Sequence, residues 1–130
     1  MSAVLKGLVS VGRSYLQAGK AQEALATFRY AIAQHGPSPL IDRWLGSAAQ
    51  LCEEDEEAIA AYERALKAAP DDLEVTVNLA ELYLNRVKIT EAAALLKRAL
   101  ALDPKITHPA GVRARVLIMK AKKQLGAASA

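Results

Sequence analysis

Small and apolar residues recur along this chain at the spacing of an α-helix. Ala58, Tyr62 and Ala65 stand at i, i+4 and i+7, which places them on one stripe of a helix. The same spacing recurs in Ala92, Leu96 and Ala99. Pro70 and Pro104 follow these two stripes, and proline ends a helix because it has no amide hydrogen and clashes with the preceding turn. The pattern predicts a chain built from helices.

The stripes belong to an internal repeat of about 34 residues, a period typical of helical-hairpin repeats. Six sets of small, aliphatic or aromatic residues keep one constant interval: Ala24, Ala58 and Ala92; Ala31, Ala65 and Ala99; Phe28, Tyr62 and Leu96; Val11, Leu45 and Leu79; Gly12, Gly46 and Ala80; Tyr15, Ala49 and Tyr83. Two helices and a short turn fill a repeat of this length, so each repeat predicts a helical hairpin. We place the repeats at approximately 5–38, 39–72 and 73–106.

The small residues of the repeat have a steric purpose. Gly12, Gly46 and Ala80 lie on the first helices, and an alanine faces them from each second helix. Side chains this small let two helix backbones approach closely, and the ring or leucine four residues after that alanine fills the adjoining gap. Helix starts are predicted at Ser38 before Pro39, at Asp71–Asp72, and at Thr107–His108 before Pro109.

Residues 107–125 continue the repeat register as one more amphipathic helix. Its inward positions are Ala110, Ala114, Leu117 and Ile118, and its outward positions are Arg113, Lys120, Lys122 and Lys123. A helix of this kind caps the open end of a stack of repeats.

The amino-acid composition favours a helical protein and argues against several classes of protein. Of the 130 residues, 52% are hydrophobic and only 5% aromatic, and most of the apolar residues are alanine and leucine. No apolar stretch approaches the roughly 20 residues of a membrane-spanning helix, and the first residues lack the pattern of a signal peptide, so we expect a cytoplasmic protein. The net charge of +3 is too mild for a dedicated nucleic-acid binder.

At this point the chain resembles the tetratricopeptide repeat family, whose pattern has Leu-Gly-x-x-Tyr on the first helix, then Ala, Phe, Ala and a late Pro. The second repeat carries Leu45-Gly46, Ala58, Tyr62, Ala65 and Pro70; the other two follow with substitutions. The resemblance implies an all-α fold, a right-handed superhelix of three hairpins plus a C-terminal capping helix, forming a single domain over 1–130. It also implies a non-enzymatic protein that binds other proteins on a concave face.

The residues offer no catalytic set. Glycines are scattered singly, without a phosphate-binding loop. His35 and His108 lie in expected turns, far apart and without partners at metal-ligand spacing, so capping or solvation is the simpler reading. Cys52 stands beside Glu53 and Glu54, which suppress thiolate formation. We expect no enzyme activity, no cofactor and no metal.

Two charged segments leave alternatives open. The run 53–57 is Glu-Glu-Asp-Glu-Glu, which suits a turn and the start of a helix, because the helix dipole favours negative charge there. The other interpretation is a docking patch for a basic partner. The basic helix at 107–125 is either a solvated cap or a contact for RNA or an anionic membrane. No aromatic residues for base stacking are interleaved there, which argues against nucleic acid.

By resemblance to the family, fifteen residues line the concave face. They are Lys6, Val9, Arg13, Leu16 and Gln17, then Leu40, Arg43, Ser47, Gln50 and Leu51, then Glu74, Val77, Glu81, Leu84 and Asn85. Charges change from basic to acidic along this series, with apolar anchors between them. The surface suits an extended or helical peptide whose acidic end lies near the first repeat, unless neighbouring helices cover several of the anchors.

Some family members hold a chaperone's C-terminal carboxylate with lysine and asparagine in the first repeat and lysine and arginine in the third. This chain has Val9 and Arg13, then Val77 and Glu81, so no such ligand is expected. The stretch Arg43-Trp44-Leu45-Gly46 and the residues after it are also similar to class II type III secretion chaperones, which hold translocator subunits in the groove. The alternative is an assembly scaffold that self-associates through its repeat edges.

Overall fold

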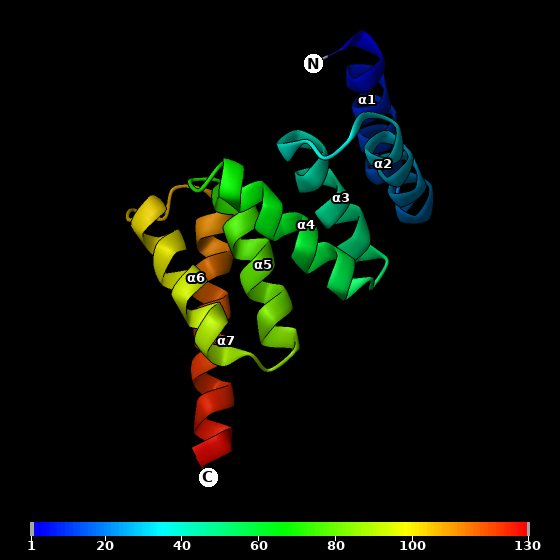
Figure 1. The fold of residues 1–130 in the computed structure, drawn as a ribbon. Helices are drawn as coiled ribbons and strands as arrows, with labels where there is room; N and C mark the ends of the chain where they lie inside the picture. Colours follow the sequence, from blue (N-terminus) through cyan, green and yellow to red (C-terminus); the bar gives the residue numbers. More distant parts are fainter. Residues whose placement is uncertain (1, 130) are drawn as a thin grey trace. The chain divides into compact units, whose positions relative to one another are not determined.

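The protein, a computed structural model in which residues 2–129 are described, consists of helices in this range, with no strand (Figure 1). The helices are α1 (Ala3–Gln17), α2 (Ala21–His35), α3 (Pro39–Leu51), α4 (Asp55–Ala68), α5 (Leu73–Asn85), α6 (Ile89–Leu102) and α7 (Pro109–Ser129). The predicted all-α fold of three hairpins and a final helix is confirmed. His35 is the last residue of α2, although a turn was expected there.

Packing divides the chain into two compact units, Met1–Pro70 with α1–α4 and Asp71–Ala130 with α5–α7. In the first unit α1 packs on α2, α2 on α3 and α3 on α4. In the second unit α7 packs against both α5 and α6. The repeat pattern carries no signal for this division, because the same set of positions recurs on both sides of it.

Each hairpin is closed by a small residue facing a large one. A Cβ atom added to Gly46 would lie 2.5 Å from two ring atoms of Tyr62, and one added to Gly12 would collide in the same way with Phe28. Both rings are fully buried. In the third hairpin these positions are Ala80 and Leu96. Alanine is larger than the glycine of the other two hairpins, and leucine is smaller than their aromatic residues. The steric prediction from the repeat is therefore confirmed.

The turn inside each hairpin has the same backbone conformation. Gly19, Glu53 and Val87 hold the same place in the three repeats and have φ of 75°, 60° and 58°. The amide after each of them donates to a carbonyl five residues back, at 2.8 Å in all three turns. This is the left-handed ending of a helix that favours glycine, and a β-branched residue such as Val87 adopts it with strain.

The start of α7 depends on a buried carboxylate from the preceding turn. Asp103 accepts hydrogen bonds from the amides of Thr107 and His108, each at 3.0 Å. These bonds hold the pKa of Asp103 below its ordinary value. A side chain at Gly111 would collide with the carboxylate. His108 Nδ1 accepts from the Ala110 amide at 3.0 Å, so the capping interpretation of this histidine is confirmed.

The structure also has helices beginning at the other predicted starts. Asp72 is the N-cap of α5 and accepts from the Val75 amide at 3.2 Å. Ser38 is the N-cap of α3, but its side chain makes no capping hydrogen bond. The acidic run begins α4, with Asp55, Glu56 and Glu57 in the first turn, as the dipole argument predicts.

The contact between Gly12 and Phe28 predicts strong coupling between these two positions. Gly12→Ala should lower the free energy of unfolding by about 1–3 kcal/mol, because the added methyl overpacks a rigid site. Combined with Phe28→Leu, which reproduces the Ala80–Leu96 pair, it should cost less than the sum of the two single changes. Urea denaturation of the two single variants and the double variant measures this coupling. Strictly additive effects would contradict the steric account.

Val87→Gly should raise the free energy of unfolding by about 0.5–1 kcal/mol. The substitution relieves a left-handed conformation that costs roughly 1–2 kcal/mol for an L-residue, and the extra freedom of glycine in the unfolded chain offsets part of that gain. Little packing is lost, because Val87 is 72% exposed. Thermal denaturation followed by circular dichroism measures the effect. Val87→Ala is the control, and its free energy of unfolding should rise less than that of the glycine variant. A Tm of the glycine variant below that of the wild type would show that the turn is not strained.

Candidate functional site

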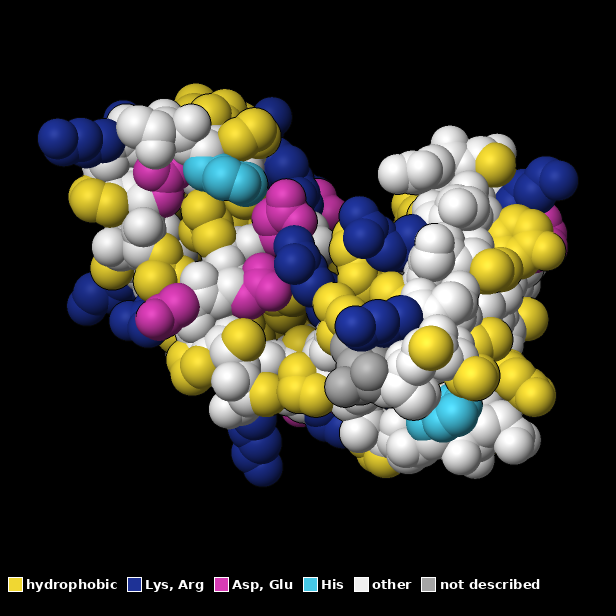
Figure 2. Space-filling model, turned by 90° about the horizontal axis from the view of Figure 1, so that it is seen from above, with side chains coloured by type: hydrophobic (Ala, Val, Ile, Leu, Met, Phe, Trp, Pro, Cys, Tyr) yellow, Lys and Arg dark blue, Asp and Glu magenta, His cyan; other side chains and the backbone are white. Residues whose placement is uncertain are grey.

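Basic and apolar side chains gather on the first helices of the first unit. Helix α1 contains Lys6 and Arg13 and no carboxylate. Helix α3 contains Arg43 and one carboxylate, Asp42, which is buried and bound to Arg64 of α4 at 2.9 and 3.1 Å. We call the predicted groove residues of these two helices the α1–α3 surface. Figure 2 shows one face of the molecule, on which hydrophobic patches alternate with charged side chains.

An aromatic ring joins the two helices at this surface. The guanidinium carbon of Arg13 lies 4.6 Å from the centroid of the Trp44 ring, and that of Arg43 lies 5.4 Å from it. At this distance a cation is attracted to the electron-rich face of an indole. Two arginines, one from α1 and one from α3, are therefore held beside a single tryptophan.

A second cluster holds the polar residues of α3. The Tyr62 hydroxyl donates to Gln50 Oε1 at 2.8 Å and lies 3.4 Å from Ser47 Oγ. Ser47 in turn donates to the Arg43 carbonyl at 3.3 Å. The ring that fills the gap beside Gly46 thus also orients two predicted groove residues.

The apolar anchors of the first unit differ in accessibility. Leu51 is 65% exposed and Leu40 is 38% exposed, whereas Leu16 is half-buried. Lys6 and Gln17 are exposed. Val9 is buried, so in this structure it belongs to the core and offers no contact to a partner.

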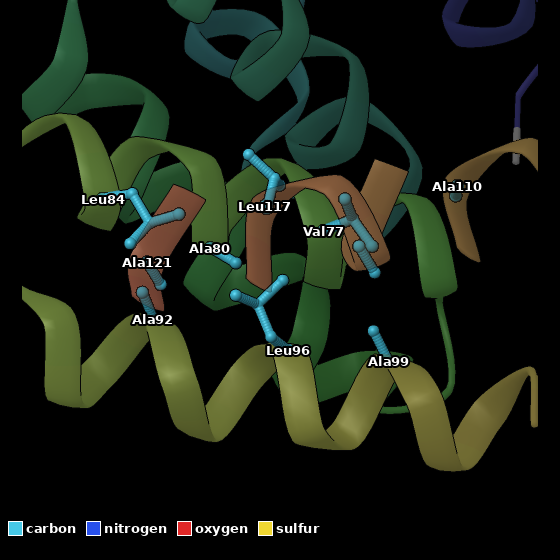
Figure 3. Close-up of a cluster of buried hydrophobic side chains, with 10 residues drawn as sticks. Val77, Ala80, Leu84, Ala92, Leu96, Ala99, Ala110, Leu117 and Ala121 are labelled. Atoms are coloured by element: carbon cyan, nitrogen blue, oxygen red, sulfur yellow. The ribbon is translucent and has the colours of Figure 1, made fainter. Parts of the chain in front are cut away.

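On α5 the predicted anchors lie inside the protein. Val77 and Leu84 are fully buried in a cluster with Leu96 of α6 and Leu117 of α7, and Figure 3 shows these side chains pointing toward one another. The expectation that Val77 and Leu84 are exposed apolar anchors is therefore corrected. The physical reason is that α7 packs on this side of α5.

The polar residues of α5 remain at the surface, close to α7. Glu81 Oε1 lies 3.6 Å from a terminal nitrogen of Arg113. Asn85 Oδ1 lies 3.5 Å from the Lys120 ammonium group. Glu74 is exposed. The basic side chains of α7 thus meet two of the predicted groove residues.

The contacts of the acidic run 53–57 and of Cys52 favour structural roles for these residues. Arg29 of α2 donates through Nε to both carboxylate oxygens of Glu57 at 3.0 and 3.2 Å, which ties α2 to α4 and raises the pKa of the guanidinium. Burial raises the pKa of the Cys52 thiol, and Glu54 adds to the shift while Arg29 opposes it. The thiol form is favoured, which weakens any nucleophilic role.

Two further features concern the described part of the chain. Within it, no three histidine, cysteine or acidic side chains are grouped as metal ligands would be. Nor does any helix in residues 2–129 have both the length and the hydropathy that crossing a bilayer requires.

Two tetratricopeptide repeat family models match the sequence, one over residues 12–54 and the other over residues 56–116, and together they include most of the chain. The chain belongs to the tetratricopeptide repeat family. Comparison with curated protein sequences gave no significant match.

Solved structures of tetratricopeptide repeat proteins have the same fold. The Yersinia enterocolitica type III secretion chaperone SycD, in complex with a peptide of the translocator YopD, is 20% identical, with a TM-score of 0.81 over 95% of this chain and 96% of that one. A type III secretion complex from Aeromonas hydrophila is 19% identical, with a TM-score of 0.83 over 97% and 85%. The first repeat domain of Spaghetti (RPAP3), bound to the HSP90 peptide SRMEEVD, is 18% identical, with a TM-score of 0.82 over 94% and 93%.

The tetratricopeptide repeat pattern did not predict the part played by Trp44. This residue is outside the fifteen predicted groove positions, yet it connects Arg13 with Arg43. The signal present in the sequence was a single tryptophan directly after an arginine on a first helix.

Proposed function

We propose that the α1–α3 surface binds a peptide segment of another protein, one that carries both acidic and apolar side chains. The observation that carries the proposal is the pair of arginines beside Trp44, on helices that also expose Leu40 and Leu51. Guanidinium groups bind carboxylates through paired hydrogen bonds, and exposed leucines favour an apolar contact. This is a binding function that requires no catalytic group.

Two of the similar structures support this proposal because they contain bound peptides, from YopD in one and from HSP90 in the other. The side chains argue against a carboxylate clamp in this chain. Val9 and Val77 are buried, and the carboxylate of Glu81 lies beside Arg113. A terminal carboxylate would meet neither a lysine nor an asparagine at these positions, so the peptide is bound through side chains.

Reversing the charge of both arginines should strongly weaken partner binding. Arg13→Glu/Arg43→Glu replaces two donors with two acceptors that repel an acidic peptide, and affinity should fall at least about tenfold. Partners captured from a lysate are quantified by mass spectrometry for the wild type, for this variant and for Leu51→Glu. Peptides from the captured partners are then titrated against the purified wild type, whose only tryptophan reports binding through its fluorescence.

The matched control is Lys105→Glu/Lys123→Glu, which makes the same change of charge at two exposed positions of the second unit. It should retain the partners that the arginine variant loses. Circular dichroism establishes that each variant is folded. If the folded arginine variant and Leu51→Glu capture the same partners as the wild type, the proposed surface is not the binding site.

Within this function, the finer role that we propose is that of a cytoplasmic chaperone or adaptor of a secretion or assembly system. Support comes from the shared fold of SycD and of the Aeromonas complex, at identities that show fold alone. The expected outcome is that the gene lies beside genes for secretion or translocator components. It is also expected that co-expression keeps such a hydrophobic subunit in the soluble fraction, with Arg13→Glu/Arg43→Glu as the negative control. A neighbourhood without such genes would contradict this role and leave peptide binding intact.

A further inference from the structure

Helix α7 carries apolar side chains on two opposite faces. Its inner face packs into the core of the second unit through buried residues spaced by helical turns: Ala110, Ala114, Leu117 and Ala121. On the outer face, Val112, Val116 and Met119 stand at i, i+4 and i+7 and therefore share one line along the helix. They are 51%, 59% and 67% exposed. We call these three residues the α7 stripe, and the core of the second unit does not cover them.

Basic side chains flank the α7 stripe on both sides. Arg115 and Lys122 are seven residues apart and lie on the flank towards α6, where Lys122 lines an apolar groove between the two helices. Arg113 and Lys120 are also seven residues apart and lie on the flank towards α5, each close to an α5 side chain. Lys123 lies in line with the stripe, at its C-terminal end. The outer face thus combines a central apolar stripe with five cations.

No carboxylate of α7 balances this charge, because the helix contains no acidic residue. Arg113 has a partner, since Glu81 of α5 lies 3.6 Å away. Among the described residues, Arg115, Lys122 and Lys123 form no ion pair. A face of this kind attracts anions, and two copies of it repel each other. The charge therefore favours an anionic partner over a second copy of the chain.

The outer face is a ridge, because a single helix presents it. Figure 1 shows that the C-terminal end of α7 extends past the ends of α5 and α6. A protein partner would have to place carboxylates on both sides of the ridge and apolar groups between them. Nucleic acid would complement the cations but would set phosphates against the stripe. A bilayer with anionic headgroups offers a continuous plane of anions with an apolar region beneath, which complements both flanks and the stripe together.

We propose that the outer face of α7 binds the surface of a bilayer that contains anionic lipids. The helix lies along the membrane, with the α7 stripe against the acyl boundary and the basic side chains among the headgroups. Long lysine and arginine side chains suit this arrangement, because their stems stay in the apolar region while their charges reach the headgroups. The inner face keeps its packing on α5 and α6. This contact goes beyond the proposed peptide binding and shares no residue with the α1–α3 surface.

The probes are extruded vesicles of pure phosphatidylcholine and of phosphatidylcholine with about 30% phosphatidylserine. The full chain should co-sediment with the anionic vesicles only, and added salt should weaken this binding. Arg115→Gln/Lys122→Gln should lower the partition coefficient at least about tenfold, since each basic residue near an anionic surface contributes about fivefold. Lys20→Gln/Lys67→Gln is the matched control, because it removes the same charge from two exposed positions of the first unit, and it should bind as the wild type does.

Val116→Gln/Met119→Gln keeps every charge and tests the stripe. It should lower the partition coefficient about three- to tenfold, because two apolar side chains no longer leave water, and circular dichroism establishes that the variant is folded. The proposal is overturned if the anionic vesicles bind no protein, if the control loses as much binding as Arg115→Gln/Lys122→Gln, or if the stripe variant binds like the wild type. Light scattering that shows a dimer of the wild type and a monomer of Met119→Glu would assign the face to a second copy and would also overturn it.

Discussion

The close approach of the two helices in each hairpin is the constraint on which the rest of the structure depends. It exists because Gly12 and Gly46 offer no side chain and because Phe28 and Tyr62 fill the space that remains. In the third hairpin the same volume is divided between Ala80 and Leu96. A close-packed interior transmits a change of one methyl group to its neighbours. These pairs of small and large residues therefore determine how the first helix of each hairpin lies against the second helix. They thereby also determine which side chains the first helix presents at the surface.

Tyr62 connects this constraint to the surface. Its ring fills the hairpin, and its hydroxyl reaches Ser47 and Gln50 on the outer side of α3. Core packing and surface chemistry thus meet in one residue in the second hairpin. Phe28 has no hydroxyl, so the first hairpin lacks this connection, and its surface is organised by Arg13 and Trp44 instead.

Much of the fold can be predicted from the repeat period alone, because residues at equivalent positions of the repeats make the same local packing contacts. Alanines spaced by one repeat length, the prolines and the capping residues predicted the hairpins and the final helix closely. The turn conformation at Glu53 and Val87 is harder to predict, since only Gly19 has the residue type that signals it. The hydrogen-bond pattern of the hairpin imposes that conformation, and the local sequence does not.

The candidate site was predicted less well, for a physical reason. A position on a first helix is exposed or buried according to what packs beside it, and the repeat pattern does not encode its neighbour. Leu16 is half-buried, whereas Leu84, two repeats later, is fully buried beneath α7, although the pattern counted both as apolar groove anchors. The contact between Trp44 and two arginines depends on side-chain direction between helices, which spacing along one helix does not determine.

The division into two units, each with its own buried side chains, has a consequence for how the molecule comes apart. Its one tryptophan lies on α3, in the first unit, whereas helices occur in both. Indole emission therefore follows the loss of structure around α1 and α3, and far-ultraviolet ellipticity follows the helices of both units. Any separation between the two melting curves is a direct measure of how far the units unfold without each other.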